Sequence, residues 1–384
     1  MNYSPDSLIS RRFLRKGENT VVSPNERNIL RLLWQHPGIA RSALNDHLDL
    51  TQQSIYRIVD ALLERGMVSL GAPVPGQGRG QPSPTLHLNG DYAYSCGISI
   101  HADVIHVYFM NFAGKLIGQD SIPLSGKTMA EALSATRKAM ADLRHRLSLS
   151  EATNLGIGVG MMGYNVGGTR FNGPLPLHEW SLIELGPLLS DTFEKPVWVH
   201  ISGQTAAAGE AMFGVGRYIQ NFAYLFIGYG FGGGLISNGE LLLGGNGNAG
   251  EFACILDPTE IDRRPALTYL MSRLQSNGIQ VPTVDHLRRN FRPDWPGVRE
   301  WIDEITPVYN RLINAIWAVF GPQAIVFGGQ VPPALARMLI DRTVSFEIPR
   351  YGVPHPPAKL IVSEMEGDAA AIGAAAIPFK RLVF

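Results

Sequence analysis

The sequence predicts an α/β protein in which a small helical domain precedes a larger domain with a substantial β-sheet. Residues 23–90 show helical periodicity and then two short strand-like segments, whereas strands alternate with helices from Asp91 onward. The chain has 384 residues, enough for two or three domains, and its 45% hydrophobic and 17% charged residues are typical of a folded protein. We therefore expect an N-terminal arm over 1–22, a helical domain over 23–90 and an α/β domain over 91–384.

Charge and cysteine content exclude several classes of protein. Basic and acidic residues are equal in number at 33 each, but residues 1–90 contain ten basic and seven acidic residues. This excess of positive charge favours contact between the N-terminal part and phosphate groups. Cys96 and Cys254 are far apart, so we expect neither a disulfide framework nor a cysteine zinc site. No apolar run reaches the ~18 residues of a membrane span. These features predict a cytoplasmic protein with no membrane partner.

The N-terminal domain contains three helix signals. Ser23 begins the first helix, because it can act as the cap residue of a capping box that Glu26 closes. The His-Pro-Gly segment at 36–38 ends this helix. A short second helix is expected around 41–48, and a third helix follows the cap residue Thr51 and runs to Arg65.

The third helix has two contrasting faces. Its buried stripe follows the i, i+3, i+4 spacing and consists of Ile55, Ile58, Val59, Leu62 and Leu63. The opposite face presents polar side chains near the helix N-terminus, namely Gln52, Gln53, Ser54, Tyr56 and Arg57. A recognition helix presents such residues to the major groove, where Gln pairs with adenine and Arg with guanine or phosphate.

The two strand-like segments at 67–70 and 85–88 flank a basic, glycine-rich loop that is typical of a wing. Arg79 stands between two glycines, so nothing bulky hinders its approach to a minor groove, and Gln81 follows in the same loop. Helix lengths, helix spacing and this loop predict a winged helix-turn-helix that binds a double-stranded DNA operator. A small helical bundle that contacts another domain is the alternative.

The larger domain alternates strands with helices. The expected strands cover 94–110 as an adjacent pair, 155–161, 195–200, 223–227 and 324–329, and the expected helices cover 129–147, 205–213, 306–320 and the chain end after Glu366. The glycine-rich run at 228–234 follows a strand, where backbone N–H groups can bind phosphate. A plain hairpin turn explains this run equally well.

Several motifs, in this order, resemble the ROK family, which is named for repressors, open reading frames and kinases. They are Gly78–Pro82, Gly228–Gly234, Asn248–Glu251, Ile325–Gly329 and Gly367–Ala375, so that the resemblance covers nearly the whole chain. It implies a winged helix-turn-helix followed by a two-lobed, actin- and hexokinase-like (ribonuclease H-like) domain with a sugar cleft. Lobe one then covers about 91–200 plus the C-terminal helix, and lobe two about 201–365.

The chain differs from the kinases of this family at the residues with which those enzymes bind ATP, act as general base and bind zinc. By this resemblance, Ser99 occupies the position of the phosphate-loop Asp and Ser202 that of the catalytic Asp. Tyr229 occupies the position of the threonine in the glycine-rich run. An unassisted serine does not accept the proton of a sugar hydroxyl near neutral pH. Cys254 replaces the histidine of the family's zinc site, and 257–272 contains no cysteine. We therefore expect no catalytic residue, no ATP, no zinc and no other cofactor.

The resemblance and the helix face together predict a DNA-binding regulator, a repressor of carbohydrate-related genes. The cleft residues expected to bind a sugar or phosphosugar effector are Asn172, Glu179, His200 and Glu251, although a turn, a core histidine or a helix cap would also explain such residues. Symmetric operators predict a homodimer or tetramer. An active carbohydrate kinase with a regulatory arm and a protein-binding scaffold are the alternatives.

Overall fold

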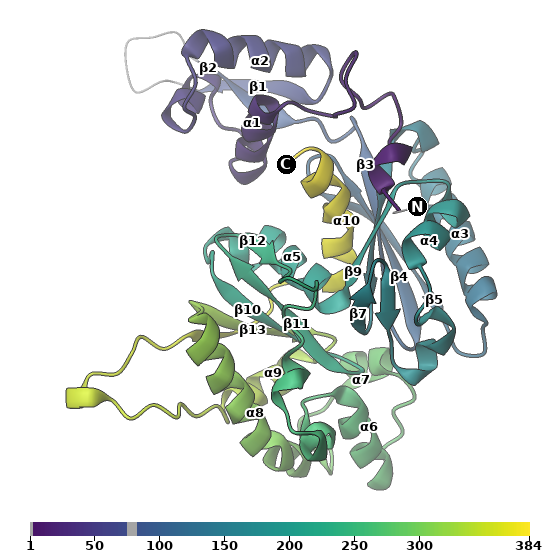
Figure 1. The fold of residues 1–384 in the computed structure, drawn as a ribbon, viewed down its shortest axis with the longest axis vertical. Coiled ribbons are helices and arrows are strands. Elements are labelled where there is room, and N and C mark those ends of the chain that lie inside the picture. Colours follow the sequence, from purple (N-terminus) through teal and green to yellow (C-terminus); the bar gives the residue numbers. More distant parts are fainter. Residues whose placement is uncertain (1–2, 75–82) are drawn as a thin grey trace.

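The computed structural model describes residues 3–74 and 83–384. Figure 1 shows a small N-terminal domain beside two larger lobes, each built on its own β-sheet, which confirms the predicted α/β class. Two predicted DNA contacts, Arg79 and Gln81, lie outside the described residues. No helix in the described part of the chain is long and apolar enough to cross a bilayer.

The N-terminal domain combines helices with a β-hairpin. Its elements are α1 (Pro24–Gln35), η2 (Arg41–Asp46), α2 (Gln52–Glu64), β1 (Val68–Val74) and β2 (Ser83–Leu88). The predicted capping box is present in α1, where the side chains of Ser23 and Glu26 accept from each other's backbone N–H. Thr51 caps α2 as predicted, since its hydroxyl accepts from the Ser54 N–H. The strands of the hairpin pair antiparallel.

The segment between α1 and α2 forms a short helix, as predicted. The helix was expected around 41–48, and the chain forms the 3₁₀-helix η2 there. Its cap residue, Ala40, has no side-chain oxygen for the first N–H groups, and short helical segments favour 3₁₀ geometry. Leu44 is buried in the core that α1 and α2 share, so η2 still supports α2.

The N-terminal arm packs against both domains. Phe13 and Val21 are buried in the same core as α1 and α2. Arg65 of α2's C-cap donates to the Val21 carbonyl oxygen at 2.7 Å and pairs with the buried Glu26 at 3.2 Å. The Tyr3 hydroxyl bonds both backbone groups of Val197 at 2.9 and 3.2 Å, which ties the arm to lobe one.

Lobe one is a five-stranded mixed sheet. Its order is β5 (Leu116–Pro123), β4 (Val104–Asn111), β3 (Tyr94–Ile100), β6 (Asn154–Met161) and β9 (Val197–Ile201). The first three strands pair antiparallel, and β6 and β9 continue the sheet in parallel. The helices α3 (Met129–Arg146) and α4 (Leu185–Phe193) and the hairpin β7 (Tyr164–Gly167) and β8 (Arg170–Asn172) complete this lobe.

Lobe two contains the second five-stranded sheet. Its order is β12 (Glu240–Leu242), β11 (Phe231–Ser237), β10 (Phe222–Ile227), β13 (Ala324–Gly329) and β14 (Lys359–Val362). Its longer helices are α6 (Leu267–Ser276), α7 (Val284–Asn290), α8 (Val298–Phe320) and α9 (Pro333–Ile340). Helix α8 begins eight residues before the predicted start, because Trp301 and Ile305 also pack into the core of this lobe. Only residues 228–230 form the predicted glycine turn, and the later glycines belong to β11.

Two helices rich in small residues, α5 (Ser202–Phe213) and α10 (Ala369–Leu382), lie between the sheets (Figure 1). A Cβ atom on Gly373 of α10 would lie 1.8 Å from the Thr205 carbonyl oxygen of α5. On β3, a Cβ atom at Gly97 would lie 2.0 Å from the Ala371 carbonyl oxygen of α10. Glycine at these positions is therefore what allows backbone to pack directly on backbone at the centre of the protein.

Candidate functional site

The exposed face of α2 carries the predicted DNA contacts. The side chains of Gln52, Gln53 and Arg57 are exposed, and no hydrogen-bond partner for the Arg57 guanidinium is found among the described residues. Ser54 is half-buried, and its hydroxyl accepts a hydrogen bond from Thr51 at 2.9 Å. Ser54 therefore supports the helix start, while the two glutamines and Arg57 remain available to a ligand.

Tyr56 contacts two neighbours on this face, Gln52 and Arg41, and Arg41 was not among the predicted DNA contacts. The Gln52 amide donates to the Tyr56 hydroxyl at 3.2 Å. The Arg41 guanidinium lies 4.5 Å from the centre of the Tyr56 ring and donates to Asp60 at 2.7 Å. Arg41 is the first residue of η2, eleven positions before the start of α2. Its charge therefore reaches the exposed face of α2 only in the folded domain.

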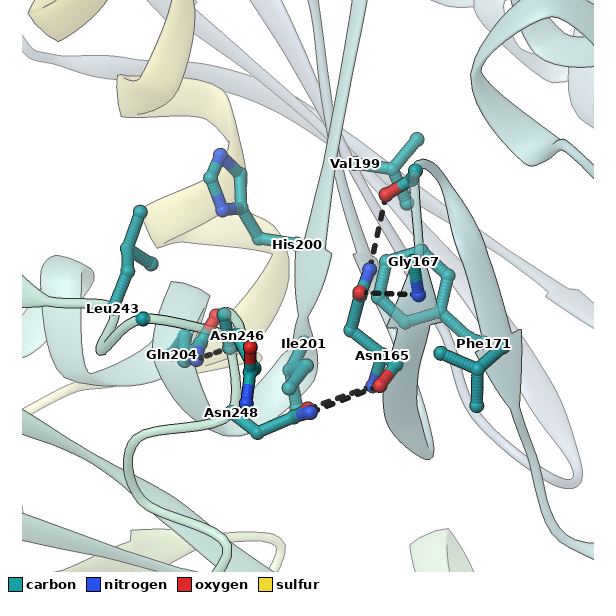
Figure 2. A pocket seen from close by; sticks show the side chains of 14 residues that line it. Asn165, Gly167, Phe171, Val199, His200, Ile201, Gln204, Leu243, Asn246 and Asn248 are labelled. Atoms are coloured by element: carbon teal, nitrogen blue, oxygen red, sulfur yellow. Dashed lines mark hydrogen bonds between the residues drawn. The ribbon is translucent and has the colours of Figure 1, made fainter.

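A second candidate site is a polar pocket between the lobes, with a volume of about 680 Å³ (Figure 2). Ligand pockets in proteins commonly enclose roughly 300–1,000 Å³. Its walls come from β7, β9, the start of α5 and the glycine-rich loop after β12. The polar side chains among its lining residues are Asn165, His200, Gln204, Asn246 and Asn248.

Two amide side chains connect the pocket walls. The Asn248 carboxamide accepts from the Asn165 N–H at 2.8 Å and donates to the Asn165 carbonyl oxygen at 2.9 Å, which joins the two lobes (Figure 2). The buried Gln204 amide donates to the carbonyl oxygens of Gly247 and Ala249 at 2.8 and 3.2 Å. These bonds hold the glycine-rich loop against lobe one and α5.

The pocket is electrically neutral. None of its lining residues is Asp, Glu, Lys or Arg, as far as the described residues show. Burial and the nearby charge of Arg381 lower the pKa of His200 to about 4, so its imidazole is neutral at pH 7. Amides, backbone N–H groups and a neutral imidazole can each exchange hydrogen bonds with uncharged hydroxyl groups.

The structure brings only part of the predicted effector site into this pocket. His200 lines it. Asn172 is outside the lining and donates to the Tyr164 hydroxyl at 2.7 Å. Glu179 is exposed on the surface rather than in the cleft, because its carboxylate accepts the Met129 N–H at the start of α3.

Glu251, the fourth predicted effector ligand, is also outside the pocket lining. It is half-buried after the glycine-rich loop, and burial raises its pKa to about 7. The amides Asn165, Gln204 and Asn246 were missed in the sequence analysis. Their signal was the repeated asparagine and glycine pattern at 244–250, but Asn165 is joined to that segment only by the fold.

Ser202 and Ser99, which the resemblance predicts to stand at two carboxylate positions of the family's kinases, are both buried. Ser202 begins α5, and its hydroxyl is buried without a hydrogen-bond partner among the described residues. Ser99 in β3 is likewise buried, with no partner in the described part of the chain. Tyr229 packs against the apolar cores of both lobes.

The DNA-binding domain contacts the C-terminal end of α10. The Arg27 guanidinium of α1 donates to the carbonyl oxygens of Phe384 at 2.5 Å and Lys380 at 3.3 Å. The rings of Trp34 and Phe384 lie 4.6 Å apart, centre to centre. Because α10 also packs on α5, which carries Gln204, one continuous set of contacts joins the pocket to the helical domain.

Comparison with known proteins identifies both parts of the chain. A family model described as ROK family matches residues 95–258, and one described as MarR family matches residues 22–69. The uncharacterized protein y4fQ of Sinorhizobium fredii is 27% identical, with 94% of this chain and 92% of that protein covered. A xylose repressor of Caldicellulosiruptor bescii is 26% identical over 61% of this chain and 59% of the repressor.

The solved structures include one with the same arrangement of domains. A ROK family transcriptional regulator, described as a homologue of Escherichia coli Mlc, superimposes with a TM-score of 0.63. The match covers 92% of this chain and 95% of the regulator at 18% sequence identity. At this identity the likeness concerns the fold, which agrees with the predicted helical domain and two-lobed domain.

Proposed function

This chain belongs to the ROK family, and from that premise we propose that it is a transcription regulator which binds operator DNA and a neutral carbohydrate. The observation that carries the DNA-binding function is the exposed polar face of α2, at the N-terminus of a capped helix in a helix-turn-helix domain. The xylose repressor among its relatives supports repression of carbohydrate-related genes. Binding of operator DNA places the protein in the cytoplasm.

DNA selection from a random duplex pool, followed by fluorescence anisotropy near physiological salt, tests this function. We expect an enriched motif bound at least about 10³-fold more tightly than unrelated duplex. Arg57→Ala should weaken binding, and Gln52→Ala should change base preference by about 1–3 kcal/mol at one position. Arg137→Ala is the matched control, because Arg137 is exposed on α3, far from α2 in the sequence. Weak binding without sequence preference would contradict the proposal.

The pocket supports an uncharged sugar rather than a phosphosugar as the effector. A phosphate usually pairs with Arg or Lys side chains, whereas the lining residues described above carry no charged side chain and offer an anion only the N-terminus of α5. Calorimetry with matched pairs of sugars and sugar phosphates distinguishes these ligands. Tighter binding of the phosphorylated member of a pair would contradict the choice of a neutral ligand.

We propose that the effector acts on DNA binding through α5 and α10. A ligand that contacts Gln204 alters the position of α5, whose backbone packs directly on α10 at Gly373. Phe384, two residues beyond the end of α10, contacts Arg27 and Trp34 of α1. An effector changes the equilibrium only by its different affinity for the two arrangements.

The kinase-like domain serves binding and assembly rather than catalysis in this proposal. Ser202 offers no carboxylate at the position of the general base, and such a base contributes about 10²–10⁴ in rate. Neither ATP nor the cysteine zinc site of the family is required. Sugar phosphorylation above the background of a Ser202→Ala variant, measured over a panel of sugars with ATP, would contradict this conclusion.

A symmetric assembly completes the proposed function. The two DNA-binding domains of one homodimer would bind two half-sites about 34–36 Å apart, and a tetramer would combine two such dimers. Analytical ultracentrifugation of the free protein and of its operator complex measures the number of chains. A monomer at micromolar concentration that binds one half-site alone would contradict the symmetric assembly.

A further inference from the structure

The structure gathers three metal-ligating side chains at a place that neither the pocket nor the DNA-binding face uses. His101 directly follows β3, His106 lies in β4 and Asp368 is the cap residue of α10. One ring nitrogen from each histidine and one carboxylate oxygen of Asp368 all lie within 4.8 Å of one another. The three residues come from two strands of lobe one and from the start of the helix that runs between the sheets.

Buried polar atoms without hydrogen-bond partners surround this cluster. Among the described residues, Ser99 Oγ, His101 Nδ1 and Asp103 Oδ1 have no partner. Ser99 and His101 are both 0% exposed. Ser99 is the cross-strand partner of His106, so both side chains lie on the same face of the sheet. Each such buried group costs about 1–3 kcal/mol, and unpaired buried polar atoms of this kind mark places where an ion or water binds.

The charges that act on the two histidines favour a cation. Asp368 and Asp103 are the carboxylates that act on His101, and Asp368 and Asp285 are those that act on His106. Among the described residues, Arg288 is the positive charge that acts on the rings of both His101 and His106. Asp285 pairs with Arg289 at 2.9 Å. With neutral imidazoles, Asp368 and Asp103 therefore face one guanidinium, and a divalent ion reduces this imbalance.

The donor atoms select the kind of ion. Zinc accepts imidazole nitrogen and carboxylate oxygen at ~2.0 Å in tetrahedral geometry, which places donor atoms roughly 3.3 Å apart. His101 Nε2 and Asp368 Oδ2 are 2.8 Å apart, so small side-chain movements suffice. The Ala371 N–H donates to the other Asp368 oxygen at 2.7 Å and orients the carboxylate. Magnesium and calcium prefer shells of oxygen that this cluster does not supply.

We propose that His101, His106 and Asp368 bind one divalent ion of the zinc class, with water as the remaining ligand. This is a different place from the family's cysteine-containing zinc site, which the sequence predicts to be lost. The site adjoins lobe two, because the other Asp103 oxygen accepts the Val284 N–H of α7 at 3.0 Å. The ion therefore stabilises the contact between β3, β4, α10 and α7.

Zinc titration of the chelator-treated full-length protein tests the proposal by calorimetry. We expect one ion per chain, and cobalt in place of zinc should give the visible absorption of a four-coordinate site. His106→Gln should weaken binding at least about 10-fold, because even outer-shell partners contribute 10–100-fold. His145→Gln, on the exposed surface of α3, should leave the affinity unchanged. His47→Gln is a second control, because its ring stacks on His36 at 5.6 Å.

Two results would overturn the proposal. One is the absence of stoichiometric zinc binding by the folded wild-type protein, and the other is equal affinity of wild type and His106→Gln. X-ray absorption spectra of the zinc-loaded wild type require no variant, and they must show imidazole scattering from two ligands. A spectrum with sulfur ligands, or with oxygen alone, would equally contradict this site.

Discussion

Gly373→Ala tests whether direct backbone packing of α10 on α5 stabilises the centre of the protein. Alanine has the higher helix propensity and would by itself add about 0.8–1.0 kcal/mol of stability. Its Cβ atom, however, would lie 1.8 Å from the Thr205 carbonyl oxygen and 2.7 Å from the Gly209 N. These neighbours are backbone atoms, which cannot rotate away as a side chain can. Overpacking typically costs about 1–3 kcal/mol, so after subtraction of the propensity gain we expect a net loss of up to about 2 kcal/mol.

Urea denaturation followed by circular dichroism measures this loss as a lower midpoint of unfolding. Gly230→Ala is the matched control, because no atom lies within 4 Å of the added Cβ and the residue lies in a turn. We expect a lower midpoint for Gly373→Ala and at most about 0.5 kcal/mol of change for the control. Equal midpoints for the two variants would refute the reasoning about α5 and α10.

Three further predictions concern the pocket, its neighbour and the domain junction. Burial raises the folded-state pKa of Glu251 from its ordinary 4.5 to about 7, so the free energy of unfolding should fall as pH rises through that interval. Glu251→Gln should remove up to about 3 kcal/mol of this pH dependence, and unchanged pH profiles would contradict the assigned burial. Asn248→Ala removes both hydrogen bonds to Asn165, so it should open the lobes and increase the radius of gyration in X-ray scattering, whereas Asn246→Ala should not. Arg27→Ala should speed amide hydrogen exchange in α1 at least about 10-fold relative to α8, because it removes charged hydrogen bonds worth about 1.5–3 kcal/mol each.

The sequence by itself determined the local structure of the DNA-binding domain. The capping box at Ser23 and Glu26 and the cap at Thr51 were predicted correctly, because a cap depends on residues only three positions apart. The buried stripe of α2 follows from helical periodicity in the same way, with Ile55, Val59 and Leu62 buried. The short helix expected around 41–48 is present as η2, and its 3₁₀ geometry was not predicted.

Only the tertiary structure decided where the functional side chains meet. Glu179 was predicted to lie in the cleft, but its carboxylate instead accepts a hydrogen bond from the N-terminus of α3. Asn165 and Asn248, which join the lobes across the pocket, are 83 residues apart, and no periodicity relates them.

The same reason explains the cluster at the end of β3. His101 and Asp368 are 267 residues apart and meet because α10 returns to the first sheet, where glycines allow it to pack closely. Caps and faces of helices depend on neighbours within a turn of the chain, which the sequence displays directly. A pocket or an ion site depends on how distant segments pack, and that packing is established only when the whole chain folds.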